Sequence, residues 1–159
     1  MTKVFQGASK SFKYFFSRYL FWGLALLWMA VIFAFSNQAN SGAFTEAYLQ
    51  DANVPIRKLA HMFEFAVLAV LYQAALAGSL ISAREPEIKT KLQAKFQTYW
   101  LALALAVLYA LSDEFHQAFV PGRSASLFDA GVDATGALIG LTCVYWLRRI
   151  LASDGQKRH

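Results

Sequence analysis

Seven ionisable side chains in this sequence lie in or beside stretches apolar enough to cross a membrane: His61, Glu64, Asp113, Glu114, His116, Asp129 and Asp133. A charged side chain in hydrocarbon costs about 3 kcal/mol even on lenient insertion scales, so such residues usually mark a functional site. Carboxylates near a histidine can exchange protons and act as general acids or bases. These residues are therefore the first candidates for a site.

Four apolar segments are long enough to place these side chains in a membrane, since a span needs about 20 apolar residues. They are residues 19–36, 59–81, 99–119 and 127–147 of a chain that is 57% hydrophobic. Strand-like alternation is absent, and lipid admits only helices or closed barrels. We therefore predict an all-α integral membrane four-helix bundle, with residues 1–159 as a single domain. A cleaved signal peptide is the alternative for the first segment, but its apolar run exceeds the usual length of about 7 to 15 residues.

The basic residues predict the orientation of the bundle. Twelve of the 15 lysines and arginines lie before the first span, between the second and third, or after the fourth. The positive-inside rule then places both termini in the cytoplasm and the ionisable candidates near the outer face. The net charge of +5 mostly reflects this topology. No basic motif interleaved with aromatic residues accompanies it, so nucleic acid is not an expected partner.

Helix geometry predicts that the candidates converge. His61 and Glu64 follow the start of the second span, and Asp113 and Glu114 precede the end of the third, so all four lie roughly 3 to 9 Å below the outer ends. At 100° per residue, each span gathers its polar residues on one face. These faces carry Arg57, His61 and Glu64; Asp113 and Gln117; and Asp129, Asp133, Gly136 and Gly140. The two glycines allow close helix packing.

We therefore expect His61, Glu64, Gln117 and Asp133 to line one polar pocket that opens outward between the last three spans. The first span would pack outside it as a largely apolar brace. Asp129 has a simpler interpretation, because Ser126-x-x-Asp129 matches a helix-capping pattern. His116 falls on another flank of its helix and is expected at the membrane interface.

Two basic residues are candidates for anion binding at the mouth of this pocket. Pro121-Gly122 predicts a tight turn that returns the fourth span beside the third. Arg123 follows the turn and could reach back over Asp113 and Glu114, or present its planar fork to a phosphate or carboxylate. Lys58 could hold the same group or extend to lipid head groups.

The sequence leaves metals and cofactors undecided. His61-x-x-Glu64 is half of several metal-binding patterns and is common by chance. Haem ligation by His61 and His116 is a further alternative. Cys143 is the single cysteine, so no disulfide can form within one chain.

Three blocks of residues carry a resemblance to a known family. They are Arg57-Lys58-x-x-His61-x-x-Glu64-Phe65-Ala66-x-Leu68, then Ser112-Asp113-Glu114-x-x-Gln117-x-Phe119-Val120-Pro121-Gly122-Arg123, then Asp129-x-x-x-Asp133-x-x-Gly136-Ala137-x-x-Gly140. This pattern resembles the VanZ-like membrane family, and Ile32-Phe33-x-Phe35-Ser36 is similar to that family's first helix. The family usually has Asn where this chain has Asp133.

The resemblance implies a small, multi-pass protein of the bacterial cytoplasmic membrane that is linked to the cell envelope. The family takes its name from a teicoplanin-resistance protein, and the resemblance brings no settled activity. The expected partner is a membrane lipid or a lipid-linked envelope precursor, with a lipoglycopeptide as a further candidate. The oligomeric state is open.

Two classes of function fit these residues. In the first, Lys58, Gln117, Arg123, Asp129 and Asp133 bind an amphiphilic or lipid-linked envelope molecule. In the second, the protein is an intramembrane hydrolase or transferase. Glu64 or Glu114 would then act as general base and His61 as proton shuttle, with Asp113 beside them. Binding is slightly favoured, because no nucleophile with a positioned base is visible.

Overall fold

The computed structural model describes residues 2–39, 45, 48–81 and 88–157, and most of these residues are helical. The four long helices are α1 (Thr2–Ser36), α3 (Asn53–Ile81), α4 (Ile88–Gln117) and α5 (Leu127–Lys157). A short 3-10 helix, η1 (Gln50–Ala52), precedes α3. No strand occurs in the described ranges, so the predicted all-α bundle is confirmed.

Three of the four predicted spans are recognised as helices long and apolar enough to cross a membrane: Tyr19–Ser36, Asn53–Gly78 and Leu127–Leu151. The predicted span 99–119 is not among them. The acidic pair Asp113 and Glu114 interrupts its apolar run, and α4 ends at Gln117 rather than at residue 119.

The predicted start of the second span, residue 59, lies too late in the chain. α3 starts at Asn53, six residues before the predicted start at residue 59. Pro55 lies in its first turn, where a helix tolerates the missing N–H. Arg57 and Lys58 consequently lie on the helix itself, one turn before His61.

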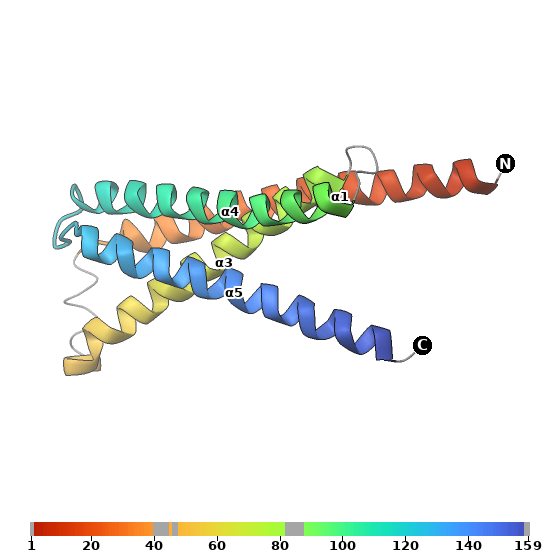
Figure 1. Cartoon of the computed structure of the whole chain (residues 1–159). Helices are drawn as coiled ribbons and strands as arrows, with labels where there is room; N and C mark the ends of the chain where they lie inside the picture. The colour runs from red at the N-terminus through yellow and green to blue at the C-terminus, as the bar shows by residue number, and fades with distance from the viewer. Residues whose placement is uncertain (1, 40–44, 46–47, 82–87, 158–159) are drawn as a thin grey trace.

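The helices alternate in direction along the bundle. Figure 1 shows that α1 begins and α5 ends at the same end of the molecule, while α1 ends, α3 begins and α4 turns into α5 at the opposite end. α3 is the central helix, because it packs against α1, α4 and α5. α1 packs mainly on α3, so its expected place at the outside of the bundle agrees with the structure.

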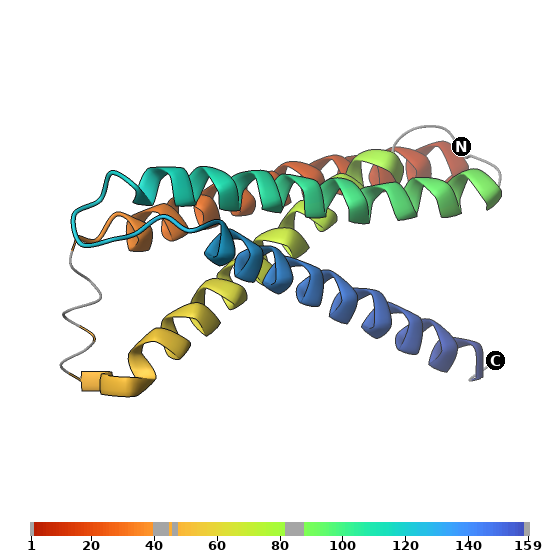
Figure 2. The ribbon, with the colours of Figure 1, turned by 60° about the vertical axis from the view of Figure 1, so that its left-hand side comes forward.

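Glycine allows α3 and α5 to cross closely (Figures 1 and 2). A Cβ atom at Gly136 would lie 2.2 Å from the carbonyl oxygen of Met62, and one at Gly140 would lie 2.7 Å from that of Ala66. These distances leave no space for a side chain at either position. The close packing predicted for the two glycines is therefore present.

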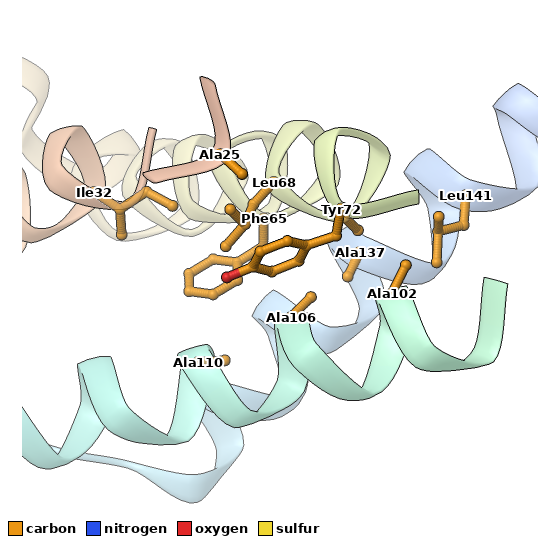
Figure 3. Close-up of a cluster of buried hydrophobic side chains, with 11 residues drawn as sticks. Ala25, Ile32, Phe65, Leu68, Tyr72, Ala102, Ala106, Ala110, Ala137 and Leu141 are labelled. Carbon is orange, nitrogen blue, oxygen red and sulfur yellow. The ribbon is translucent and has the colours of Figure 1, made fainter. Parts of the chain in front are cut away.

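Small residues on α4 make room for the aromatic residues of α3. Ala102, Ala106 and Ala110 recur at intervals of four residues and are fully buried. They lie opposite Phe65 and Tyr72 (Figure 3). Large apolar side chains also cover the outside of the bundle, and Leu27 of α1 is 63% exposed. Such an exterior fits a lipid environment, since water-soluble monomers rarely expose large continuous apolar surfaces.

Candidate functional site

A cavity of about 210 Å³ lies where α4 connects to α5, next to the start of α3. Seven of the nine predicted site residues line it: Lys58, His61, Glu114, Gln117, Arg123, Asp129 and Asp133. The other lining residues are Val54, Arg57, Gly122, Ser124 and Val132. Three helices that are distant in sequence thus bring the predicted residues together.

The other two predicted residues lie behind this lining. Asp113 Oδ2 accepts a hydrogen bond of 2.7 Å from Gln117 Nε2. Glu64 Oε2 lies 3.9 Å from His61 Nδ1. Asp113 and Glu64 therefore each lie next to a residue that lines the cavity.

A tight turn places Arg123 at the cavity. The N–H of Arg123 donates to the carbonyl of Val120 at 3.1 Å. Gly122, between them, has a φ of 77°, a left-handed conformation that glycine adopts without a Cβ penalty. The turn predicted from Pro121-Gly122 is present, with glycine at the position that requires positive φ.

Arg123 connects the end of α4 to the end of α1. Its Nη1 donates to Gln117 Oε1 at 3.3 Å, and its Nη2 donates to the carbonyl of Phe35 at 2.8 Å. It thus contacts Gln117, which itself donates to Asp113. Burial lowers the pKa of the Arg123 guanidinium, and the positive charge of Arg57 lowers it further, against the raising effect of the nearby carboxylates.

Ser36 is part of the polar cluster, which sequence reasoning missed. Its Oγ is buried and donates to Asp113 Oδ2 at 2.7 Å, and it accepts from Gln117 Nε2 at 3.2 Å. The first helix, expected to be a largely apolar brace, thus contributes a polar residue to the cluster at its last turn. The signal was a single hydroxyl at the end of an apolar run, within the segment that resembles the family's first helix.

Glu114 and Asp129 have roles different from those their sequence positions suggest. Glu114 Oε2 accepts a 2.7 Å hydrogen bond from the backbone N–H of Ser126, just before α5. Asp129 instead pairs with Lys58, with 2.5 Å between Nζ and Oδ1. In the capping pattern, Asp129 would accept from Ser126. Glu114, from the neighbouring helix α4, accepts this hydrogen bond from Ser126 instead.

Two carboxyl groups with incomplete hydrogen bonding lie between α3 and α5. His61 Nδ1 is 3.8 Å from Asp133 Oδ1 and 3.9 Å from Glu64 Oε2, both longer than a hydrogen bond. Among the described residues, Glu64 Oε2 and Asp133 Oδ2 are buried with no hydrogen-bond partner. A buried carboxylate without partners is costly, so the group resembles a functional site more than structural packing.

His116 has different surroundings from His61. Its Nε2 lies 3.2 Å from Asn37 Oδ1, and its ring centre is 4.5 Å from that of Phe33. The two histidines of the haem hypothesis therefore have no neighbour in common. Within the described ranges, no group of three or more His, Cys, Asp and Glu residues could hold a metal ion.

The fold and the cluster define a helical membrane protein with polar residues gathered at one end of its bundle. A family model described as VanZ/LLP1 matches residues 21–148, and the chain belongs to this family. The resemblance seen in the sequence is thereby confirmed. Comparison with curated proteins and with solved structures gave no match.

Proposed function

We propose that this protein is a multi-pass protein of the bacterial cytoplasmic membrane that binds an amphiphilic or lipid-linked cell-envelope molecule by its anionic head group. The head group would occupy the cavity at the α4–α5 turn, facing outward. The observation that supports this best is that two arginines, Arg57 and Arg123, line one cavity of about 210 Å³.

Arg57 is free to receive a ligand. In the part of the chain that the structure describes, it makes no hydrogen bond or ion pair, whereas Lys58 is held by Asp129. Arg57 is close enough to Arg123 for its charge to lower the pKa of Arg123. A phosphate between the two would replace this repulsion by charge-assisted hydrogen bonds, and guanidinium groups match its geometry.

The acidic residues that line the cavity do not prevent anion binding. Lys58 neutralises Asp129, and Glu114 is bonded to the backbone of Ser126. Asp133 lies deeper, and its side chain is 2% exposed. The mouth of the cavity is therefore its basic part.

We also propose that α4 is a fourth span, although its composition alone does not identify it. α1 begins and α5 ends at the same end of the bundle (Figure 1), which fits an even number of crossings. The exposed rings of Phe96 and Phe115 bracket α4 at a separation of about 28 Å, and Phe128 and Trp146 bracket α5 at about 27 Å. Both separations approach the thickness of a bilayer core, about 30 Å.

The test compares a polyprenyl phosphate with the polyprenol of the same length, bound to the purified protein in lipid nanodiscs. The phosphate should bind more tightly, and Arg57→Ala or Arg123→Ala should weaken its binding about tenfold, as expected for the loss of one hydrogen bond to a charged group. Arg148→Ala, which removes an equal charge away from the cavity, should have no effect. Equal binding of phosphate and alcohol would refute the proposal.

Arg123→Lys tests the role of the planar fork. Lysine keeps the charge and loses the second donor, so binding of the polyprenyl phosphate should fall toward the level of Arg123→Ala. Full binding by Arg123→Lys would show that charge alone suffices.

The proposed link to glycopeptide resistance has its own test, since expression should reduce teicoplanin susceptibility and Arg57→Ala should abolish that reduction.

A second candidate function, an intramembrane hydrolase or transferase, is favoured by one observation. His61 lines the cavity and has Glu64 and Asp133 within 4 Å of its Nδ1, an arrangement suited to proton transfer. If the protein released inorganic phosphate from the same polyprenyl phosphate, and Glu64→Gln abolished release without weakening binding, the enzyme would be the better account.

A further inference from the structure

A second cavity lies between α4 and α5 at the opposite end of the bundle from the polar cluster. Its volume is about 450 Å³, and its lining includes Phe96, Tyr99 and Trp100 of α4 and Leu138, Tyr145 and Arg149 of α5. Figures 1 and 2 both show α5 separating from α4 toward its C-terminal end, where this cavity lies. We call it the lateral groove.

Among the described residues that line the lateral groove, Arg149 is charged and the others are mostly apolar or aromatic. Its lining also contains Thr142, whose hydroxyl donates to the carbonyl of Leu138 at 2.7 Å. Arg149 lies at one end with its guanidinium carbon 5.5 Å from the centre of the Tyr145 ring. Within the described residues, Arg149 has no carboxylate partner. The groove therefore offers apolar surface for a chain and a cation for its head group.

From this geometry we propose that the lateral groove binds an anionic phospholipid, with one acyl chain along the rings of α4 and α5 and its phosphate on Arg149. The groove volume lies within the range of about 300 to 1,000 Å³ typical of small-molecule sites. From Leu138 to Arg149, α5 rises about 16 Å, which leads from the apolar part of the helix toward its end.

Charge and position select this occupant over another helix. A partner helix would bury the arginine without an evident counter-charge, whereas a phospholipid carries its negative charge at the membrane surface. The predicted topology puts this end of the bundle on the cytoplasmic side, whose leaflet is rich in anionic lipids and where basic pockets between spans bind their head groups. This site is separate from the proposed outer cavity, and either could exist without the other.

The experiment is native mass spectrometry of the full chain in detergent, titrated with phosphatidylglycerol or with phosphatidylcholine of the same acyl chains. We expect phosphatidylglycerol to be retained preferentially. Arg149→Ala should reduce its affinity about fivefold, the effect of one basic residue near a membrane surface. Arg148→Ala is the matched control, because it removes the same charge from a neighbouring residue that does not line the groove.

Two further variants separate charge from shape. Arg149→Lys keeps the charge and should retain most of the binding, and Leu138→Trp should fill the groove and reduce the affinity for both lipids. If Arg148→Ala and Arg149→Ala reduced the affinity for phosphatidylglycerol equally, the proposal would be overturned, because general charge attraction would then explain the binding. A protein dimer that Leu138→Trp dissociates would overturn it too, since the groove would then hold a second copy.

Discussion

The ionisable residues near the α4–α5 turn fall into two groups that differ in their hydrogen bonds. Asp113, Glu114 and Asp129 each have a donor within 2.7 Å, from Ser36 or Gln117, from Ser126 and from Lys58. Glu64 and Asp133 each have a buried oxygen without any donor in the described part of the chain. The first group holds helix ends together, and the second is available for a ligand or a proton.

This difference predicts opposite effects of isosteric substitution. Asp133→Asn and Glu64→Gln should leave the melting temperature unchanged or raise it, because each replaces a buried carboxyl group that has no hydrogen bond to lose. Asp113→Asn should lower it, since hydrogen bonds to a charged group contribute about 1.5 to 3 kcal/mol. Thermal unfolding of the purified variants measures both.

The result would also distinguish a site from a scaffold. If Asp133→Asn and Glu64→Gln prevented accumulation of inserted protein, these carboxylates would be structural. A stable Asp133→Asn protein with altered ligand binding would instead assign them to function.

At the level of residues, the sequence predicted positions better than partners. The depth and helical face of His61, Gln117 and Asp133 follow from the spacing of residues, and the structure places all three at one cavity. The pairing of Asp129 with Lys58, and the role of Ser36, depend on how each helix is rotated against its neighbours. Spacing within one helix does not contain that information.

Among the elements, α3 and α5 can cross closely because Gly136 and Gly140 have no side chains. Gly136→Ala should destabilise the bundle by roughly 1 to 3 kcal/mol, the usual cost of overpacking, because its Cβ would meet the backbone of Met62 rather than a flexible side chain. Thermal unfolding in detergent measures the change.

Gly131 provides the control on the same helix. A Cβ there would meet nothing within 4 Å, so Gly131→Ala should keep or slightly raise the melting temperature through better helix propensity. If both substitutions had equal effects, loss of glycine flexibility and not the crossing would explain Gly136→Ala.

Element boundaries show a second limit of sequence reasoning. The apolar run alone suggested that the second span begins at residue 59, whereas α3 begins at Asn53. A helix does not end where its apolar residues end, since its backbone hydrogen bonds continue into the polar interface. The sequence therefore predicted the number and order of the long helices but not how far α3 extends beyond its apolar part.

For the whole molecule, the position of the chain ends gives a test of topology. Reporters fused after His159 or within residues 84–95 should report the cytoplasm, and one near Gly122 should report the outside, because the basic residues flank the first two sites. Protease protection of the same fusions gives an independent measurement. A reporter at residues 84–95 that faced outward would contradict both the orientation and the assignment of α4 as a span.

The central place of α3 has a consequence for biosynthesis. α3 carries His61, and Asp133, which lies 3.8 Å from it on α5, is synthesised about 70 residues later. At about 5 to 20 residues per second, the delay is roughly 4 to 14 s. During that time the polar face of α3 has no α5 to cover it. We expect the nascent chain to keep α3 beside the protein wall of the insertion machinery until α5 emerges, so that both helices enter the lipid together.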